Sequence, residues 1–349
     1  MDLALVWFFI IAILWTGYLV LEGFDFGVGM LMSLLPRGDS AHREKERRVL
    51  VNSIGPVWDG NEVWLITAVG ATFAAFPEWY ATLFSGFYLP LLVILVVLIV
   101  RGVAFEYRGK ISDAGWARRC DIAIHVGSWV PAILWGMTFA NLVRGVELSD
   151  THQYLGGLAS LLNPFALLGG ATTLVLFLLH GSVFVALKTD GEIRARARRF
   201  AGVLSAAALA VAGGWALWAQ LAFSVTWTWA VVAAAALALV GVALTNRAGR
   251  EGWAFGLSAA TIIAAVVLIF GSMFPDVMPG LDGGPALSIA EASSTPYTLT
   301  VLTWAAVVLT PVVILYQGWT YWVFRRRLTV DHIPAPAGLT WKKIKESAF

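Results

Sequence analysis

The stretch LPLLVILVVLIVRGVAF, residues 89–105, decides the class of fold, because it is apolar almost throughout and carries one charged residue, Arg101. About 20 apolar residues cross the hydrocarbon core of a bilayer. A second such run is AVVAAAALALVGVAL, residues 230–244. The 349 residues are 59% hydrophobic and 13% charged, and their mean hydropathy of +0.76 is far above that of a soluble domain. The sequence therefore predicts an all-α, polytopic membrane protein.

Nine apolar segments are predicted to span the membrane, and the loops between them alternate in charge. The spans are at about 3–35, 50–75, 79–106, 121–143, 163–187, 200–223, 227–245, 254–274 and 298–324. Every lysine and arginine except Arg101 and Arg144 falls in the segments 36–49, 107–120, 188–199, 246–250 and 325–349. Because positive residues stay on the cytoplasmic side, this pattern predicts an outside N-terminus and a cytoplasmic C-terminus.

We expect one transmembrane domain over residues 1–349, with two four-helix groups at about 1–143 and 163–274 and a final helix at 298–324. The apolar N-terminus lacks a basic leader and a small-residue cleavage site, which favours a retained helix. The single cysteine excludes an intrachain disulfide and any all-cysteine metal site. Since the basic loops flank membrane spans, we interpret them as topology determinants and expect no nucleic-acid partner.

Two predicted spans carry carboxylates at matching spacing. Glu22 and Asp25 are three residues apart in the first span, and Asp59 and Glu62 repeat that spacing in the second. Residues three apart lie on one face of a helix, so each helix presents an acidic face. An ionised group in the bilayer centre costs at least ~2.5 kcal/mol, which favours a partner or a water-filled path for each acid.

The rise of an α-helix places Asp25, Asp59 and Arg101 in the cytoplasmic half of the membrane, so Arg101 is the expected counter-charge, with Glu106 nearer the surface. Two structural alternatives stay open. Pro56 can begin the second helix, which would put Asp59 in its opening turn beside the helix dipole. Arg101 can equally hold three helices together in a purely structural ion pair.

The histidines do not form a pattern that predicts haem ligands. Within the spans there are only His125 and His180, with no evident partner for either, and we interpret each as a hydrogen-bonded helix residue. The sequence shows no phosphate loop, paired metal ligands or nucleophile triad. We therefore expect no catalytic residue, metal site or bound cofactor in this chain alone.

Several motifs together resemble subunit II of the cytochrome bd quinol oxidases, and they cover almost the whole chain. The most specific is NSIGPVWDGNEVWLITAVGATFAAFPEWYATLFSGFY, residues 52–88. It is preceded by GFDFGVGML (23–31) and followed in order by RGVAFEYR (101–108), NPFALLGG (163–170), FPDVMP (274–279), ASSTPYTL (292–299) and TWAAVVLTPVVILYQGWTYW (303–322). The link FSVTW, residues 223–227, is shorter than the outer loop of some members.

The resemblance implies a bacterial cytoplasmic-membrane complex of the aerobic respiratory chain that oxidises menaquinol or ubiquinol and reduces dioxygen to water. It implies that two b-type haems and one d-type haem are held by a larger subunit I, and that this chain is the haem-free counterpart. Small accessory membrane subunits, membrane lipids and a structural quinone or lipid are further expected partners.

The resemblance also suggests why acids lie within the spans, since the haem site takes up protons from the cytoplasm. Family membership carries this role over best to Asp59 with its neighbour Trp58, and then to Asp25, while Arg101 and Glu106 follow from depth and charge. The main alternative is a proton-coupled secondary transporter, for which buried acids would be equally natural. A scaffold with structural acids only is the second alternative.

Overall fold

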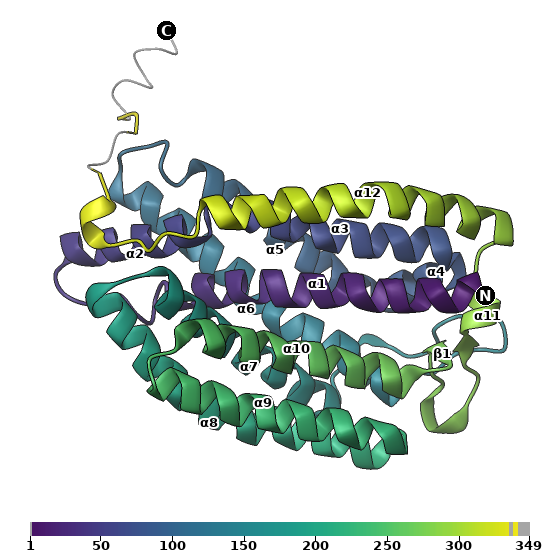
Figure 1. Ribbon diagram of the computed structural model, residues 1–349. Helices are drawn as coiled ribbons and strands as arrows, with labels where there is room; N and C mark the ends of the chain where they lie inside the picture. Colours follow the sequence, from purple (N-terminus) through teal and green to yellow (C-terminus); the bar gives the residue numbers. More distant parts are fainter. Residues whose placement is uncertain (1, 335–337, 341–349) are drawn as a thin grey trace, which may run out of the picture.

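The computed structural model describes residues 2–334 and 338–340 and consists of a bundle of long helices with short helices at both ends (Figure 1). Eight helices of this described part are long and apolar enough to span a membrane. They are α1 (Leu3–Leu31), α5 (Tyr88–Tyr107), α6 (Ala114–Arg144), α7 (Pro164–Lys188), α8 (Gly191–Ala222), α9 (Trp229–Arg247), α10 (Glu251–Met273) and α12 (Pro296–Val323).

A further long helix, α3 (Trp58–Ala75), has 18 residues but is less apolar, because Asp59, Asn61 and Glu62 lie in its first two turns. With α3 the described bundle contains the nine predicted long helices. The prediction that residues 50–75 form one helix is wrong, however. A separate polar helix, α2 (Ser40–Ile54), ends before Pro56, which lacks a backbone N–H, and the backbone leaves helical geometry at Val57 before α3 begins.

The predicted span 79–106 is also divided. It consists of α4 (Pro77–Gly86) and α5, with a break at Phe87. The ring of Pro90 would clash with the carbonyl of the residue four positions earlier, which explains why the helix does not continue from Gly86.

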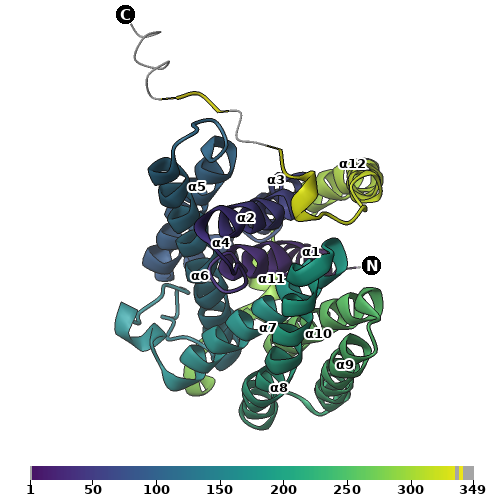
Figure 2. The same ribbon diagram turned by 90° about the vertical axis from the view of Figure 1, so that its left-hand side faces the viewer.

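Helix α1 occupies the centre of the bundle and packs against α3, α6, α7 and α10 (Figure 2). Its contact with α7 is close, since a Cβ at Gly27 would lie 2.6 Å from the Cα of Gly181. By contrast, α12 lies at the edge beside α3 and has Leu299 as its one buried residue. The predicted division into two four-helix groups stays a prediction.

At the end of the bundle that holds α2, charged side chains join segments that are distant in sequence. Arg108 donates to Glu44 at 3.0 Å, Arg196 pairs with Glu46, and Arg48 donates to the carbonyl of Pro334 at 2.7 Å. These contacts bring α2, the α5–α6 loop, the start of α8 and the segment after α12 together.

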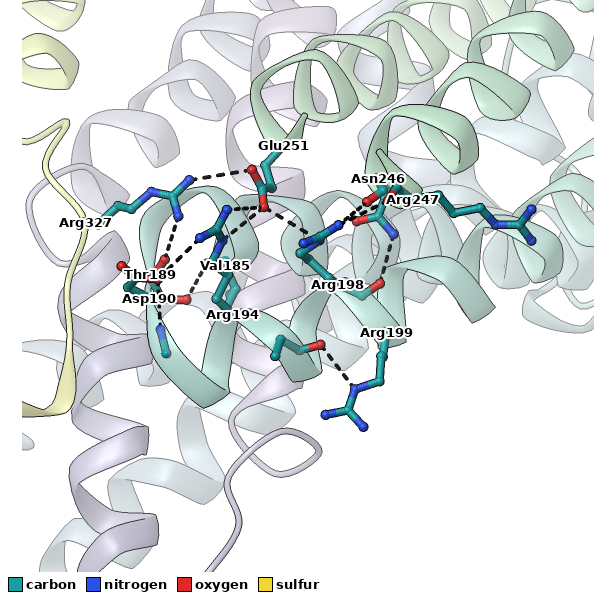
Figure 3. Close-up of polar contacts among 12 residues, drawn as sticks. Val185, Thr189, Asp190, Arg194, Arg198, Arg199, Asn246, Arg247, Glu251 and Arg327 are labelled. Atoms are coloured by element: carbon teal, nitrogen blue, oxygen red, sulfur yellow. Dashed lines mark hydrogen bonds and ion pairs between the residues drawn. The ribbon is translucent and has the colours of Figure 1, made fainter. Parts of the chain in front are cut away.

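Figure 3 shows a second group of contacts at this end, in which three arginines converge on Glu251 at the start of α10. Arg194 Nη2 lies 2.8 Å from Glu251 Oε1, Arg198 Nε lies 3.7 Å from the same oxygen, and Arg327 Nη2 lies 3.6 Å from Oε2. Arg198 also donates to the carbonyl of Asn246 at 2.9 Å. All five basic segments of the sequence therefore have members at one end of the molecule.

The opposite end carries a small antiparallel hairpin of β1 (Asp276–Met278) and β2 (Leu287–Ser288), followed by α11 (Ile289–Ala292). The 144–162 loop joins this hairpin segment, because Val146 donates its N–H to Pro279 and its carbonyl accepts from Leu281. The two long loops at this end, residues 144–162 and 274–297, thus pack on each other.

Candidate functional site

Arg101 of α5 and Glu22 of α1 form an ion pair inside the bundle, and both side chains are fully buried. The guanidinium lies over two aromatic rings, 4.9 Å from the centroid of Phe26 and 5.0 Å from that of Phe105. A glycine faces the stem of the arginine from α6, since a Cβ at Gly127 would lie 2.6 Å from Arg101 Cβ. The sequence therefore provides both the counter-charge and the space that a buried arginine needs.

Glu62 connects this pair to the surface. Its Oε2 lies 3.9 Å from Arg101 Nη1, and its side chain is 20% exposed. Arg101 is thus placed between a fully buried carboxylate on α1 and a partly exposed one on α3.

Asp25 lies in a second, adjoining set of contacts that includes residues not predicted from the sequence. Its Oδ2 accepts a hydrogen bond of 2.6 Å from Asn61 Nδ2. The carbonyl oxygen of Asn61 accepts from Tyr321 at 2.6 Å and from Gln317 at 3.2 Å, and Gln317 Oε1 accepts from Trp64 at 2.8 Å. Helix α12, otherwise exposed, is therefore tied to α3 and α1 by polar side chains one turn apart.

The seven residues Glu22, Asp25, Asn61, Glu62, Arg101, Gln317 and Tyr321 are called the buried polar cluster below. Its three carboxylates face one guanidinium, so two protons make the cluster neutral. Glu22 Oε2, Asp25 Oδ1 and Arg101 Nη2 are buried and have no hydrogen-bond partner among the described protein atoms. Buried polar atoms of this kind are normally satisfied by water, and such a cluster can exchange protons.

Asp59 lies outside this cluster. It is exposed in the first turn of α3, and its Oδ1 accepts from the N–H of Gly60 at 2.8 Å. No ion pair joins it to Arg101 within the described residues. Because the preceding helix ends at Ile54, Asp59 is at a helix start, as the structural alternative for this residue predicted.

Trp58 and Glu106 flank the cluster without a polar contact to it. The indole of Trp58 stacks on Phe105 with ring centroids 5.3 Å apart, and Phe105 in turn lies under Arg101. Glu106 is exposed on α5. Of the seven residues singled out from the sequence, the structure brings Glu22, Asp25, Glu62 and Arg101 together and leaves Asp59, Trp58 and Glu106 around them.

The histidines within the spans are hydrogen-bonded to neighbouring helices. Both ring nitrogens of buried His180 are engaged, Nδ1 with Ser258 Oγ at 2.7 Å and Nε2 with the Val20 carbonyl at 3.2 Å. His125 Nδ1 lies 3.4 Å from Ser33 Oγ. Among the described residues no group of three or more His, Cys, Asp or Glu is placed to hold a metal ion. Both ring nitrogens of His180 are therefore occupied by hydrogen bonds within the chain.

Comparison with known proteins identifies the family. A profile described as "Cytochrome bd terminal oxidase subunit II" matches residues 3–324. The chain is 41% identical over 331 residues to the Bacillus subtilis cytochrome bd ubiquinol oxidase subunit 2, covering 93% of this chain and 96% of the relative. It is 36% identical over 371 residues to the Escherichia coli K12 cytochrome bd-I ubiquinol oxidase subunit 2, covering 95% and 96%.

The fold is also found in a solved structure. A chain of the bd oxidase from Geobacillus thermodenitrificans superimposes with a TM-score of 0.74, 18% sequence identity, and coverage of 93% of this chain and 99% of the other. Since the profile and the relatives extend over nearly the whole sequence, the chain belongs to the cytochrome bd terminal oxidase subunit II family.

Proposed function

We propose that this chain is the haem-free subunit II of a bacterial quinol oxidase and that its buried polar cluster delivers protons from the cytoplasm. The complex oxidises menaquinol or ubiquinol and reduces dioxygen to water. Its haem-bearing subunit I carries two b-type haems and one d-type haem. Membership of the bd oxidase family replaces the alternative of a proton-coupled secondary transporter.

The observation that carries the proton proposal is the charge balance of the cluster. Glu22, Asp25 and Arg101 lie on helices that are apolar enough to span a membrane, and Glu62 lies beside them on α3. Ionised groups in such an environment are costly, so the carboxylates in excess of Arg101 favour binding protons. A group that binds protons inside the membrane and connects to the surface is what a proton relay requires.

Glu62 and Asp59 provide that connection along α3. Asp59 is exposed in the first turn, and Glu62, one turn further on, is 20% exposed and 3.9 Å from Arg101. Protons that enter near Asp59 pass through water to Glu62 and then to the buried Glu22. Asp25, Asn61 and Tyr321 extend the hydrogen-bonded set towards α12.

Assembly with subunit I is supported by the exposed apolar faces of this chain. On α12 the side chains of Trp304, Leu315 and Trp319 are 67%, 74% and 62% exposed. These faces are suited to lipid, a structural quinone, small accessory subunits or the haem-bearing subunit. Both ring nitrogens of His180 are hydrogen-bonded within the chain, and we assign the haems to subunit I.

The experiment is replacement of Asp59 by Asn in the assembled oxidase, because Asn keeps the shape of the side chain and removes the proton-binding group. We expect quinol-dependent oxygen consumption to fall severalfold while the haem spectrum and subunit ratio stay normal. Glu106→Gln is the matched control, since Glu106 is exposed and forms no hydrogen bond or ion pair with the cluster. Unchanged oxygen consumption in Asp59→Asn would assign Asp59 a purely structural role at the start of α3. Loss of assembly would instead assign it a packing role.

A further inference from the structure

A groove of about 930 Å³ opens at the basic end of the molecule, between the end of α1, α2, the α5–α6 loop and the start of α6. This volume is in the range of small-molecule sites. Five arginines and three carboxylates line it: Arg43, Arg47, Arg48, Arg108, Arg118, Glu44, Asp113 and Asp121.

All three carboxylates of the groove are already engaged within the protein. Arg108 donates to Asp121 at 2.6 Å and to Glu44 at 3.0 Å. Burial opposes the charge of Arg108, but the hydrogen bond to Asp121 and the charges of both acids raise its pKa, so it stays ionised. Asp113 accepts from the N–H of Trp116 at 2.7 Å and caps α6.

Three further arginines of the groove have no carboxylate partner within the part of the chain that the structure describes. Arg48 donates to the carbonyl of Pro334. The side chains of Arg43, Arg47 and Arg118 form no hydrogen bond or ion pair with any other described residue, although Arg47 is only half-exposed. Three guanidinium groups thus face one groove without a carboxylate partner among the described residues. Guanidinium groups bind phosphate oxygens in a planar, bidentate arrangement.

An apolar surface continues from the same groove along α6. Ile122 lines the groove and is 53% exposed, and Val126, one turn further on, is 43% exposed. Both residues lie within the span predicted at 121–143, whereas Arg118 precedes it. The groove therefore lies where the predicted membrane surface meets the basic end of the bundle.

We propose that this groove binds a phosphate-bearing anion through Arg43, Arg47 and Arg118, namely the headgroup of an anionic phospholipid whose acyl chains lie along Ile122 and Val126. A phospholipid headgroup and a free phosphate ion both present phosphate oxygens that the arginines can bind. The apolar surface beside the groove favours the lipid as the source. Basic residues next to a membrane span attract anionic headgroups.

The test is lipid binding to the purified, assembled oxidase, measured by native mass spectrometry with short-chain phosphatidylglycerol. Short-chain phosphatidylcholine and inorganic phosphate are titrated separately. We expect the triple variant Arg43→Gln/Arg47→Gln/Arg118→Gln to bind phosphatidylglycerol about tenfold more weakly or worse. The double variant Arg43→Gln/Arg118→Gln changes only exposed side chains and gives the same answer if Arg47 proves necessary for folding.

The matched control removes three exposed positive charges at the same end that do not line the groove: Lys45→Gln/Arg119→Gln/Arg199→Gln. We expect it to bind phosphatidylglycerol as the unmodified complex does. A further outcome is that millimolar inorganic phosphate competes with phosphatidylglycerol in the unmodified complex but not in the triple variant. That result would support the site, with free phosphate as its ligand. Equal weakening in the control and triple variants, or equal binding of phosphatidylcholine, would overturn the proposal.

Discussion

Among single residues, Asn61 is the one that connects Asp25 to α12. Its side-chain nitrogen donates to Asp25, and its side-chain oxygen accepts from Tyr321 and Gln317. We predict that Asn61→Leu lowers the free energy of unfolding, by about 1–3 kcal/mol for each buried group left without a partner. The measurement is thermal or denaturant unfolding of the complex in detergent. Asn52→Leu is the control, since Asn52 is exposed on α2 and its side chain forms no hydrogen bond with a described residue. Equal effects of the two substitutions would show that the Asn61 hydrogen bonds do not contribute.

Glu22 and Arg101 allow a double-mutant cycle, because each is the other's fully buried partner. We predict that Arg101→Met costs about 3–5 kcal/mol of stability, since it leaves Glu22 buried without its counter-charge. The double variant Glu22→Met/Arg101→Met should lose clearly less than the sum of the single variants. Additive losses would mean that the pair does not act as a unit.

The sequence predicted the charged members of this cluster but not the neutral ones. Arg101, Glu22 and Asp25 are conspicuous because a charge in an apolar run requires a partner. Asn61, Gln317 and Tyr321 carry no such signal, because amides and phenols are tolerated in many helical environments. Asn61 and Tyr321 are also 260 positions apart, and no local pattern indicates that they meet.

At the scale of helices, the close approach of α1 and α7 depends on two facing glycines. A Cβ at Gly27 would lie 2.2 Å from the carbonyl of Phe177 and 2.6 Å from the Cα of Gly181. We predict that Gly27→Ala forces the helices apart and lowers the melting temperature of the complex by several degrees, as at other small-residue helix contacts in membranes. Gly256→Ala on α10 is the control, because nothing lies within 4 Å of its added Cβ. The control should be neutral or slightly stabilising, and equal melting temperatures for both variants would contradict this explanation.

Helix breaks were the least predictable elements. Hydropathy reports whether a segment is apolar, and it joined 50–57 to α3 and α4 to α5 because the residues at both breaks are themselves apolar or small. The residues that indicate these breaks are Pro56 and Pro90. Each proline lacks a backbone N–H, and its ring clashes with the carbonyl of the residue four positions earlier, so a helix ends or shifts there. The correction matters for function, because it moves Asp59 from inside a helix to its exposed first turn.

For the whole molecule, the charge asymmetry of the loops predicts the orientation in the membrane. The described basic segments lie together at the end that carries α2 and Glu251, and we expect this end to face the cytoplasm. In a Cys120→Ser background, a cysteine at Lys45 should react with a thiol reagent only when the reagent can cross the membrane. A cysteine at Asp150, in the loop that packs on the hairpin end, should react with an impermeant reagent in intact cells. The opposite labelling pattern would contradict the orientation.

At the same scale, the proposal that this subunit is haem-free and supplies protons to the oxidase accounts for both the buried acids and the hydrogen-bonded histidines. Glu62 is the decisive residue. Of the three cluster carboxylates it is the one that is partly exposed, and it lies 3.9 Å from Arg101. Glu62→Gln keeps the size of the side chain and removes its proton-binding group.

The most direct measurement is proton uptake when the fully reduced, assembled oxidase reacts with dioxygen, followed with a pH-sensitive dye beside the haem absorbance. We predict that Glu62→Gln slows proton uptake severalfold, while the haem spectrum, the subunit ratio and the initial reaction with dioxygen stay as in the unmodified complex. Glu106→Gln should take up protons at the unmodified rate. Proton uptake that is equally fast in Glu62→Gln and in the unmodified complex would contradict the proton-delivery role of the cluster.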